Sequence, residues 1–131
     1  MNTMDESINP TKKYLLYIED DRIAYDVVRM FLRDYFEIDW ANSAEAGFKM
    51  LIEKNYAGIL MDINLARGMD GIQATQAIRQ MPGFEKIPII AITAYAMLHD
   101  KDEFLSKGCT AYISKPFSRN DLQELVTDTI K

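Results

Sequence analysis

Short apolar runs that end abruptly in polar residues recur along this chain. The four clearest runs cover residues 14–18, 59–61, 87–92 and 111–113, and a weaker one covers residues 37–40. Their side chains are continuously apolar instead of alternating, and several are β-branched. Such runs are typical of strands that are buried on both faces of a sheet.

Amphipathic helical patterns lie between these runs. In the first, we expect one apolar face that comprises Ile23, Val27, Met30 and Phe31 and is widened by Val28 and Leu32. In the second, Ser43 is placed as an N-cap, and the i, i+3, i+4, i+7 spacing is followed by Ala44, Gly47, Phe48 and Leu51. The last pattern offers Ser118 or Asn120 as its cap and comprises Leu122, Leu125, Val126 and Ile130.

Two further segments, residues 72–80 and 96–107, are less regular helices, stopped by Pro82-Gly83 and by Gly108. Strand and helix therefore alternate along the whole chain. This alternation predicts an α/β fold, in which a parallel sheet is covered by helices on both faces. We expect a flexible polar leader over residues 1–13 and one domain over residues 14–131.

Polar side chains follow the strand runs at the point where each run ends. Glu19 and Asp20 follow the first run, Asp62 the second, Thr93 the third, and Lys115 lies just beyond the last. The carboxyl ends of parallel strands meet at one edge of a sheet, where ligands bind, so we expect these five side chains to converge.

Three carboxylates in one place repel each other unless a cation joins them. Oxygen ligands with room for water suit Mg²⁺, whereas zinc is disfavoured because histidine and cysteine are absent from these strand ends. The cation, Lys115 and the Thr93 hydroxyl could together neutralise and hold a phosphoryl group. An ionised aspartate is already a competent nucleophile for phosphoryl transfer.

The four strand-end segments resemble the signature segments of response-regulator receiver domains, and the resemblance extends from about Tyr14 to the C-terminus. The segments are Ile18-Glu19-Asp20-Asp21, Leu60-Met61-Asp62-Ile63-Asn64, Ile92-Thr93-Ala94 and Tyr112-Ile113-Ser114-Lys115-Pro116-Phe117. The resemblance implies a flavodoxin-like, doubly wound (βα)5 fold, whose five-stranded parallel sheet has the order 2-1-3-4-5.

The resemblance also implies a metal site. Mg²⁺, with Mn²⁺ as a substitute, would be held directly by Asp20, Asp62 and the backbone carbonyl of Asn64. Glu19 would assist through a bound water.

Asp62 would be the phosphoacceptor. The phosphoryl group would be bound by Lys115, the Thr93 hydroxyl and the Ala94 amide. A shift of Thr93 would let Tyr112 rotate inward and change the surface of the fourth helix, fifth strand and fifth helix. The bond before Pro116 would be cis.

The implied function is a phosphorylation switch in a two-component or phosphorelay system, not a turnover enzyme. A sensor histidine kinase or a histidine phosphotransfer protein would donate the phosphoryl group from a phosphohistidine, and an unidentified downstream protein would receive the signal. The domain would act as a monomer or as a phosphorylation-dependent dimer. Cys109-Thr110-Ala111 precedes Tyr112 in place of the acidic pair usual in winged-helix transcription factors, which favours a phosphorelay or hybrid-kinase context.

The loop after Asp62 departs from the family pattern. It is one residue longer before Met69-Asp70-Gly71 and lacks a proline. Gly68 and Gly71 can accept the positive φ of a remodelled turn. Arg67 is expected to be a solvated loop residue, with projection toward the mouth of the pocket as the alternative. We expect Asp21 and Asp70 to be solvated or capping acids, and the loop leaves the lifetime of the phosphate open.

Three further side chains have readings of their own. Tyr95 either covers the phosphate or is a plain exposed aromatic. We expect His99 to lie in the fourth helix, away from the chemistry, and Cys109 to be buried.

Composition excludes other classes of function. The formal charge of −5 argues against a nucleic-acid surface and against docking on anionic membranes. A single cysteine rules out an intrachain disulfide, and no apolar stretch is long enough to span a bilayer. We therefore expect a cytoplasmic protein.

Three rival functions can be weighed from the same residues. A nucleotide- or flavin-binding module would need a glycine-rich first turn in place of Glu19-Asp20-Asp21. A hydrolytic phosphatase would need a second acid where Asn64 stands. The remaining alternative is a pseudo-receiver, a protein-binding module that does not depend on phosphorylation. Loss of Asp62, Asp20 or Lys115 would mark it, and all three are present.

Overall fold

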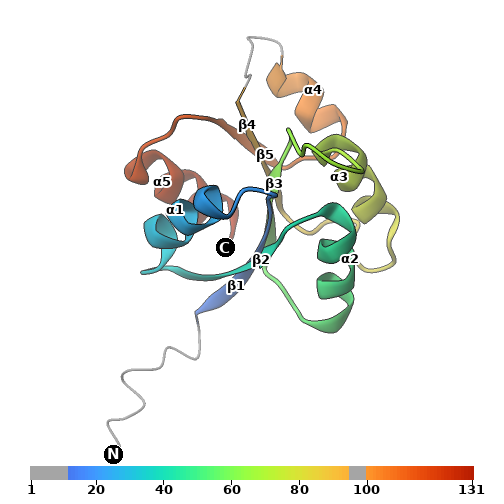
Figure 1. Ribbon diagram of the computed structural model, residues 1–131, viewed down its shortest axis with the longest axis horizontal. Helices are drawn as coiled ribbons and strands as arrows, with labels where there is room; N and C mark the ends of the chain where they lie inside the picture. The colour runs from blue at the N-terminus through green and yellow to red at the C-terminus, as the bar shows by residue number, and fades with distance from the viewer. Residues whose placement is uncertain (1–11, 95–99) are drawn as a thin grey trace, which may run out of the picture.

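The computed structural model describes residues 12–94 and 100–131 (Figure 1). Five strands alternate with five helices along these residues. The strands are β1 (Lys13–Ile18), β2 (Phe36–Ala41), β3 (Gly58–Asp62), β4 (Ile89–Thr93) and β5 (Ala111–Ser114). The helices are α1 (Arg22–Leu32), α2 (Ala44–Glu53), α3 (Gly71–Gln80), α4 (Asp100–Ser106) and α5 (Arg119–Thr129).

The five strands form one parallel sheet in the order β2-β1-β3-β4-β5. α1 and α5 cover one face, and α2 and α3 cover the other, with α4 beside β4 and β5 (Figure 1). The predicted doubly wound, flavodoxin-like fold is confirmed. The order reverses between β1 and β3, so the carboxyl ends of these two neighbours open onto the crevice where this fold binds ligands.

Side chains of β1 alternate between the two hydrophobic layers. Leu15 and Tyr17 enter the layer shared with α1 and α5, whereas Leu16 and Ile18 enter the layer shared with α2 and α3. All four are fully buried. Because each large apolar side chain stabilises the fold by roughly 1.5–3 kcal/mol when it leaves water, this strand anchors the residues that follow it.

The buried face of α1 differs from our expectation. Val28 and Leu32 are buried, whereas Ile23, Val27 and Met30 are exposed to solvent. The apolar stripe of this helix is wider than the surface that the sheet covers, so periodicity alone could not tell which side of the stripe would be buried. One edge of the stripe stays in contact with water.

Capping side chains fix where four helices begin. The Ser43 side chain accepts from the Ala46 amide at 3.1 Å, and the Ser118 side chain accepts from the Asp121 amide at 3.0 Å, so Ser118 and not Asn120 caps the last helix. Asp70 forms a reciprocal capping box with Gln73 at the start of α3. Asp21 likewise caps α1 through the Ile23 amide, as expected of a capping acid.

The two glycines of the long loop have different roles. Gly68 has a φ of +69°, as predicted, but Gly71 has no positive φ. A Cβ at position 71 would lie 2.3 Å from the carbonyl oxygen of Asp62. Gly71 is therefore needed because α3 begins against the backbone that carries Asp62.

Some boundaries differ from the sequence patterns. β1 begins at Lys13, which we had placed in the leader, and β4 begins at Ile89 instead of residue 87. The expected roles of Tyr95 and His99 lie outside the described residues. No helix within the described ranges is long and apolar enough to cross a membrane. The division into leader and domain and the cytoplasmic location stay predictions.

Candidate functional site

Three carboxylates meet at the carboxyl ends of β1 and β3. Oxygen atoms of Glu19, Asp20 and Asp62 lie within 4.8 Å of one another. Glu19 and Asp62 are only 1% and 3% exposed, whereas Asp20 is open to solvent. The strand-end acids therefore converge as the sequence predicted, with one side of the cluster accessible from water.

Asp62 is the last residue of β3 and is held by its own backbone turn. Its Oδ1 atom accepts from the Asn64 amide at 3.0 Å. β3 lies between β1 and β4, so Asp62 is the central acid of the edge. Asp62 is buried, yet its carboxylate lies within 4.8 Å of the exposed Asp20.

Electrostatic strain in this cluster appears at Glu19. Burial, together with a hydrogen bond and charge repulsion from Asp62, raises the pKa of Glu19 to about 7. Lys115 and the Asp21 amide act in the opposite direction. One lysine does not balance three carboxylates, so the group favours an additional cation.

The donor set fits a hard divalent cation. The three acids offer carboxylate oxygens, and histidine or cysteine does not join them within the part of the chain that the structure describes. Mg²⁺ prefers such oxygen ligands and keeps several waters, which the exposed side at Asp20 could admit. The residues present therefore fit the cation that the sequence suggested.

Lys115 reaches the same edge from the end of β5. Its Nζ atom lies 3.4 Å from Glu19 Oε1. Its backbone amide donates to the Thr93 carbonyl, which ties this residue to the end of β4. The predicted cis bond between Lys115 and Pro116 is confirmed. An ammonium group is thus present beside the acids.

Thr93 and Ala94 direct their donors toward the side chain of Asn64. The Ala94 amide donates to Asn64 Oδ1 at 3.1 Å, and the Thr93 hydroxyl lies 3.4 Å from the same oxygen. The sequence predicts these two donors as ligands of a phosphoryl group, but it does not predict that the side-chain oxygen of Asn64 accepts from both of them. The sequence pattern assigns Asn64 a role only through its backbone carbonyl, whereas the structure gives its side chain a role as well.

The longer loop after Asp62 is tied to the cluster. The Ala66 amide donates to Asp20 Oδ2 at 2.8 Å, which joins the loop to the exposed acid. Arg67 is exposed, as predicted, and borders a cavity of about 430 Å³ that Asp20 and Ser43 also line.

Tyr112 lies on β5 and is half-buried. Its ring centroid is 5.6 Å from that of Phe104 on α4, and it lines a groove of about 610 Å³ together with Leu105 and Leu125. Cys109 is buried, as expected. Tyr112 therefore joins β5 to the surface between α4 and α5.

Two aromatic contacts to Glu19 were missed from the sequence. The buried Tyr17 hydroxyl donates to Glu19 Oε1 at 3.0 Å, and Trp40 Nε1 donates to the Glu19 carbonyl. A signal existed for the first contact, because residues two apart on a strand share a face. The second contact joins β2 to the end of β1 and had no sequence signal.

Comparisons with known proteins agree on one family. The family model of the response regulator receiver domain matches residues 15–127. Response regulator Rre1 of Synechocystis is 30% identical over 118 residues, which are 88% of this chain and 51% of that protein. Transcriptional regulatory protein SrrA of Staphylococcus aureus is 33% identical over 109 residues, covering 82% of this chain and 44% of that protein. The chain thus spans about half the length of these relatives.

A solved structure matches almost end to end. The receiver domain of sensor histidine kinase PA1611 from Pseudomonas aeruginosa is 30% identical with a TM-score of 0.81, covering 92% of this chain and 98% of that chain. That structure has a magnesium ion coordinated in its active site cleft.

Proposed function

The chain belongs to the response regulator receiver domain family, and we propose that Asp62 is its phosphoacceptor. Receiver domains are signalling switches, and this one would take a phosphoryl group from a phosphohistidine and pass the signal through its surface. The observation that carries the proposal is the meeting of Glu19, Asp20 and Asp62 within 4.8 Å, with Lys115 at the same edge.

Asp20 and Asp62, with the Asn64 backbone carbonyl, would hold Mg²⁺, and Glu19 would act through water. The cation would neutralise negative charge that develops on the phosphoryl oxygens during transfer. The Asp62 carboxylate would attack phosphorus, and the bond from phosphorus to the donor imidazole would break with its electron pair leaving on that nitrogen. Lys115 would move from Glu19 to a phosphoryl oxygen.

Thr93 and Ala94 would bind the remaining phosphoryl oxygens. For this step their donors must leave Asn64 Oδ1, so Asn64 would have to turn away when phosphate arrives. Thr93 pairs with Ser114 across β4 and β5, so its movement would then reach Tyr112, which lies two residues earlier on β5. We propose the α4-β5-α5 surface as the output face, which a downstream protein would contact.

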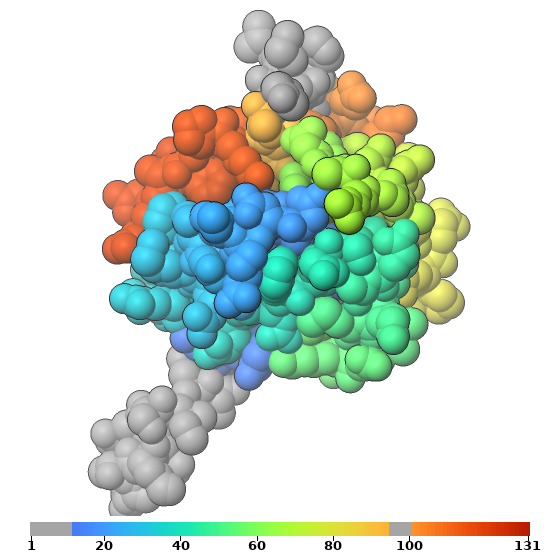
Figure 2. Space-filling view, viewed as in Figure 1, coloured from blue at the N-terminus to red at the C-terminus, as the bar shows by residue number. Residues whose placement is uncertain are grey.

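The phosphohistidine donor would be a sensor histidine kinase or a histidine phosphotransfer protein. Its docking is supported by the exposed edge of α1, which lies beside the segment leading into α5 (Figure 2). A groove of about 340 Å³ there is lined by Ile23, Val27 and Phe117 and reaches Lys115. An apolar helix face of the donor would cover these side chains while its histidine approached Asp62.

Intact-mass measurement after incubation with acetyl phosphate and Mg²⁺ tests the phosphoacceptor. Wild type should gain one phosphoryl group, and Asp62→Asn should gain none. Asp70→Asn is the matched control, because it also removes an exposed acid yet leaves an N-cap residue on α3. An equal adduct on Asp62→Asn would refute the assignment. No adduct on any variant would favour the pseudo-receiver, which binds partners without phosphorylation.

Docking can be tested separately from chemistry. Ile23→Ala should slow transfer from a phosphorylated histidine phosphotransfer protein but leave phosphorylation by acetyl phosphate unchanged. Ile52→Ala on α2 is the matched control, since Ile52 is 75% exposed and Ile23 is 72% exposed. Equal slowing by both variants would place the donor elsewhere.

A further inference from the structure

Tyr17 is a core residue whose hydroxyl reaches the acidic cluster. It lies in β1 with its ring fully buried in the layer that α1 and α5 cover. Tyr17 and Glu19 are two residues apart, so their side chains leave the backbone on the same face. The hydroxyl donates to Glu19 Oε1 at 3.0 Å.

The partner of this hydroxyl distinguishes it from an ordinary core tyrosine. A buried hydroxyl needs a hydrogen-bond acceptor, and a backbone carbonyl is sufficient. Tyr25, in the same layer, donates to the Ile38 carbonyl at 3.0 Å. Tyr17 instead donates to a carboxylate of the functional site, and hydrogen bonds to charged acceptors are the stronger kind.

Glu19 Oε1 accepts from two donors that differ in how freely their side chains can move. Tyr17 is enclosed by the core, whereas the Lys115 side chain is about one-third exposed and lies farther away, at 3.4 Å. The other oxygen, Oε2, accepts from the Asp21 amide at 3.2 Å. When Lys115 leaves Glu19 for another anion, Tyr17 keeps its hold on Oε1.

We propose that Tyr17 is a positioning residue, which holds the Glu19 carboxylate at the cation site while Lys115 moves to the phosphoryl group. The proposal rests on the proposed function and names the residue that keeps this acid aligned. Without the hydroxyl, Glu19 would depend on Lys115, and the same lysine could not serve Glu19 and a phosphoryl oxygen equally well.

Tyr17→Phe removes the hydroxyl and keeps the ring. Mg²⁺ alone is titrated against the full chain, with the fluorescence of Trp40, the single tryptophan, and calorimetry as readouts. The Mg²⁺ concentration at half-saturation should rise about three- to tenfold, the scale of one ordinary hydrogen bond lost, because Tyr17 acts on the cation only through Glu19. With acetyl phosphate, the Mg²⁺ requirement should change more than the rate at saturating Mg²⁺, a split that a purely structural defect would not produce.

Tyr56→Phe is the matched control. Its hydroxyl donates to the Asp39 carboxylate at 2.8 Å, so the same chemical deletion is made far from the cluster. This variant should leave the Mg²⁺ titration within twofold of wild type. An equal shift in both variants, or no shift in Tyr17→Phe, would overturn the positioning role.

A double-mutant cycle with Glu19→Asp isolates the contact. An aspartate at position 19 is one methylene shorter and withdraws the carboxylate from Tyr17. Tyr17→Phe should then have little additional effect on Mg²⁺ binding, whereas full additivity would contradict the proposal. Wild type that binds Mg²⁺ and accepts phosphate, with Tyr17→Phe unchanged, would refute this inference alone. Wild type that does neither would refute the proposed function, and the inference with it.

Discussion

Two groups of tyrosine, carboxylate and lysine lie in this molecule, and only one of them is a candidate for chemistry. The strand-end group comprises Tyr17, Glu19 and Lys115, with hydrogen bonds or ion pairs of 3.0 and 3.4 Å to Glu19. The edge group comprises Tyr56, Asp39 and Lys54, with contacts of 2.8 and 3.0 Å to Asp39. The residue types are nearly the same, so they do not decide the function.

Charge balance separates the two groups. Asp39 and Glu19 each have one lysine at ion-pair distance, but carboxylate oxygens of Asp20 and Asp62 also lie within 4.8 Å of Glu19. The edge group is therefore compensated within the protein, and the strand-end group is left with excess negative charge. A bound cation would therefore offset charge repulsion in the strand-end group, whereas the edge group has no such repulsion for a cation to offset.

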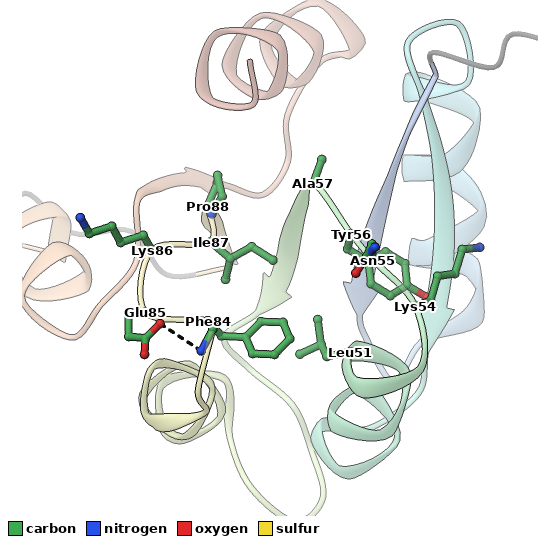
Figure 3. A pocket seen from close by; sticks show the side chains of 11 residues that line it. Leu51, Lys54, Asn55, Tyr56, Ala57, Phe84, Glu85, Lys86, Ile87 and Pro88 are labelled. Carbon is green, nitrogen blue, oxygen red and sulfur yellow. Dashed lines mark hydrogen bonds between the residues drawn. The ribbon is translucent and has the colours of Figure 1, made fainter.

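The size of a cavity does not separate them in the same way. A cavity of about 840 Å³ lies beside the edge group and is lined by Lys54 and Tyr56, with Leu51 and Phe84 facing each other across it (Figure 3). The cavity beside Asp20 has about 430 Å³. The smaller one is lined by Asp20, one of the three acids, so the candidate site is marked by its charges and not by the volume of its cavity.

The largest expected effect concerns Asp20. Asp20→Ala should abolish Mg²⁺ binding in calorimetry, because it removes the acid that we propose as a direct ligand on the exposed side of the cluster. Asp39→Ala removes an acid from the edge group and should leave the affinity within twofold. Comparable losses in both variants would mean that overall charge, not the strand-end geometry, binds the cation.

The second effect is on stability as pH changes. The pKa of Glu19 is about 7 in the folded protein, above its ordinary 4.5, so the folded state binds this proton more tightly than the unfolded state. Without metal, the free energy of unfolding should therefore fall as pH rises from 4.5 to 7 and then level off. Urea titrations would measure it.

Glu19→Gln is the control for this pH dependence. It should flatten the fall in stability between these pH values, and saturating Mg²⁺ should flatten it in wild type. If the slope persists in Glu19→Gln, another group is responsible.

A smaller effect is expected for Lys115. Lys115→Met removes a positive charge 3.4 Å from Glu19, so Mg²⁺ should bind about three- to tenfold more tightly even though a phosphoryl group would be held less well. Lys54→Met in the edge group should not alter Mg²⁺ binding. Weaker binding in Lys115→Met would show that the lysine organises the acids more than it competes with the cation.

The smallest effect concerns the stability of the edge group. Lys54 is partly exposed, pairs with Asp39 at 3.0 Å and lies 3.6 Å from the centroid of the Tyr14 ring. Lys54→Met should lower the free energy of unfolding by about 0.5–1 kcal/mol, with less effect at high salt. Lys49→Met, an exposed lysine on α2, is the comparison. A loss above about 2 kcal/mol would mean that this pair is structurally as important as the strand-end group.

Much of the site could be predicted from residues at the ends of strands. Parallel strands bring their carboxyl ends together, so the convergence of Glu19, Asp20 and Asp62 follows from their positions after apolar runs. The helix caps at Ser43 and Asp70 could also be predicted, because each side chain accepts from a backbone amide only three residues ahead. Local rules were sufficient wherever the partner was close in sequence.

Prediction failed where several neighbours competed. On α1 the apolar residues outnumber the places against the sheet, and the packing with α5 selected Val28 and Leu32 over Ile23. At position 71 glycine is needed because a Cβ would collide with the backbone of Asp62. The sequence pattern could not predict this close approach.

The sequence by itself determined the family, the order of strands and helices, and the set of acids that meet at one edge. Only the tertiary structure decided how each polar group is paired: Tyr17 and Lys115 on Glu19, and Thr93 and Ala94 on Asn64. The physical reason is that strand direction fixes which residues share an edge of the sheet. Hydrogen-bond partners instead depend on differences of a few tenths of an ångström in the distance between side chains that are far apart in the chain.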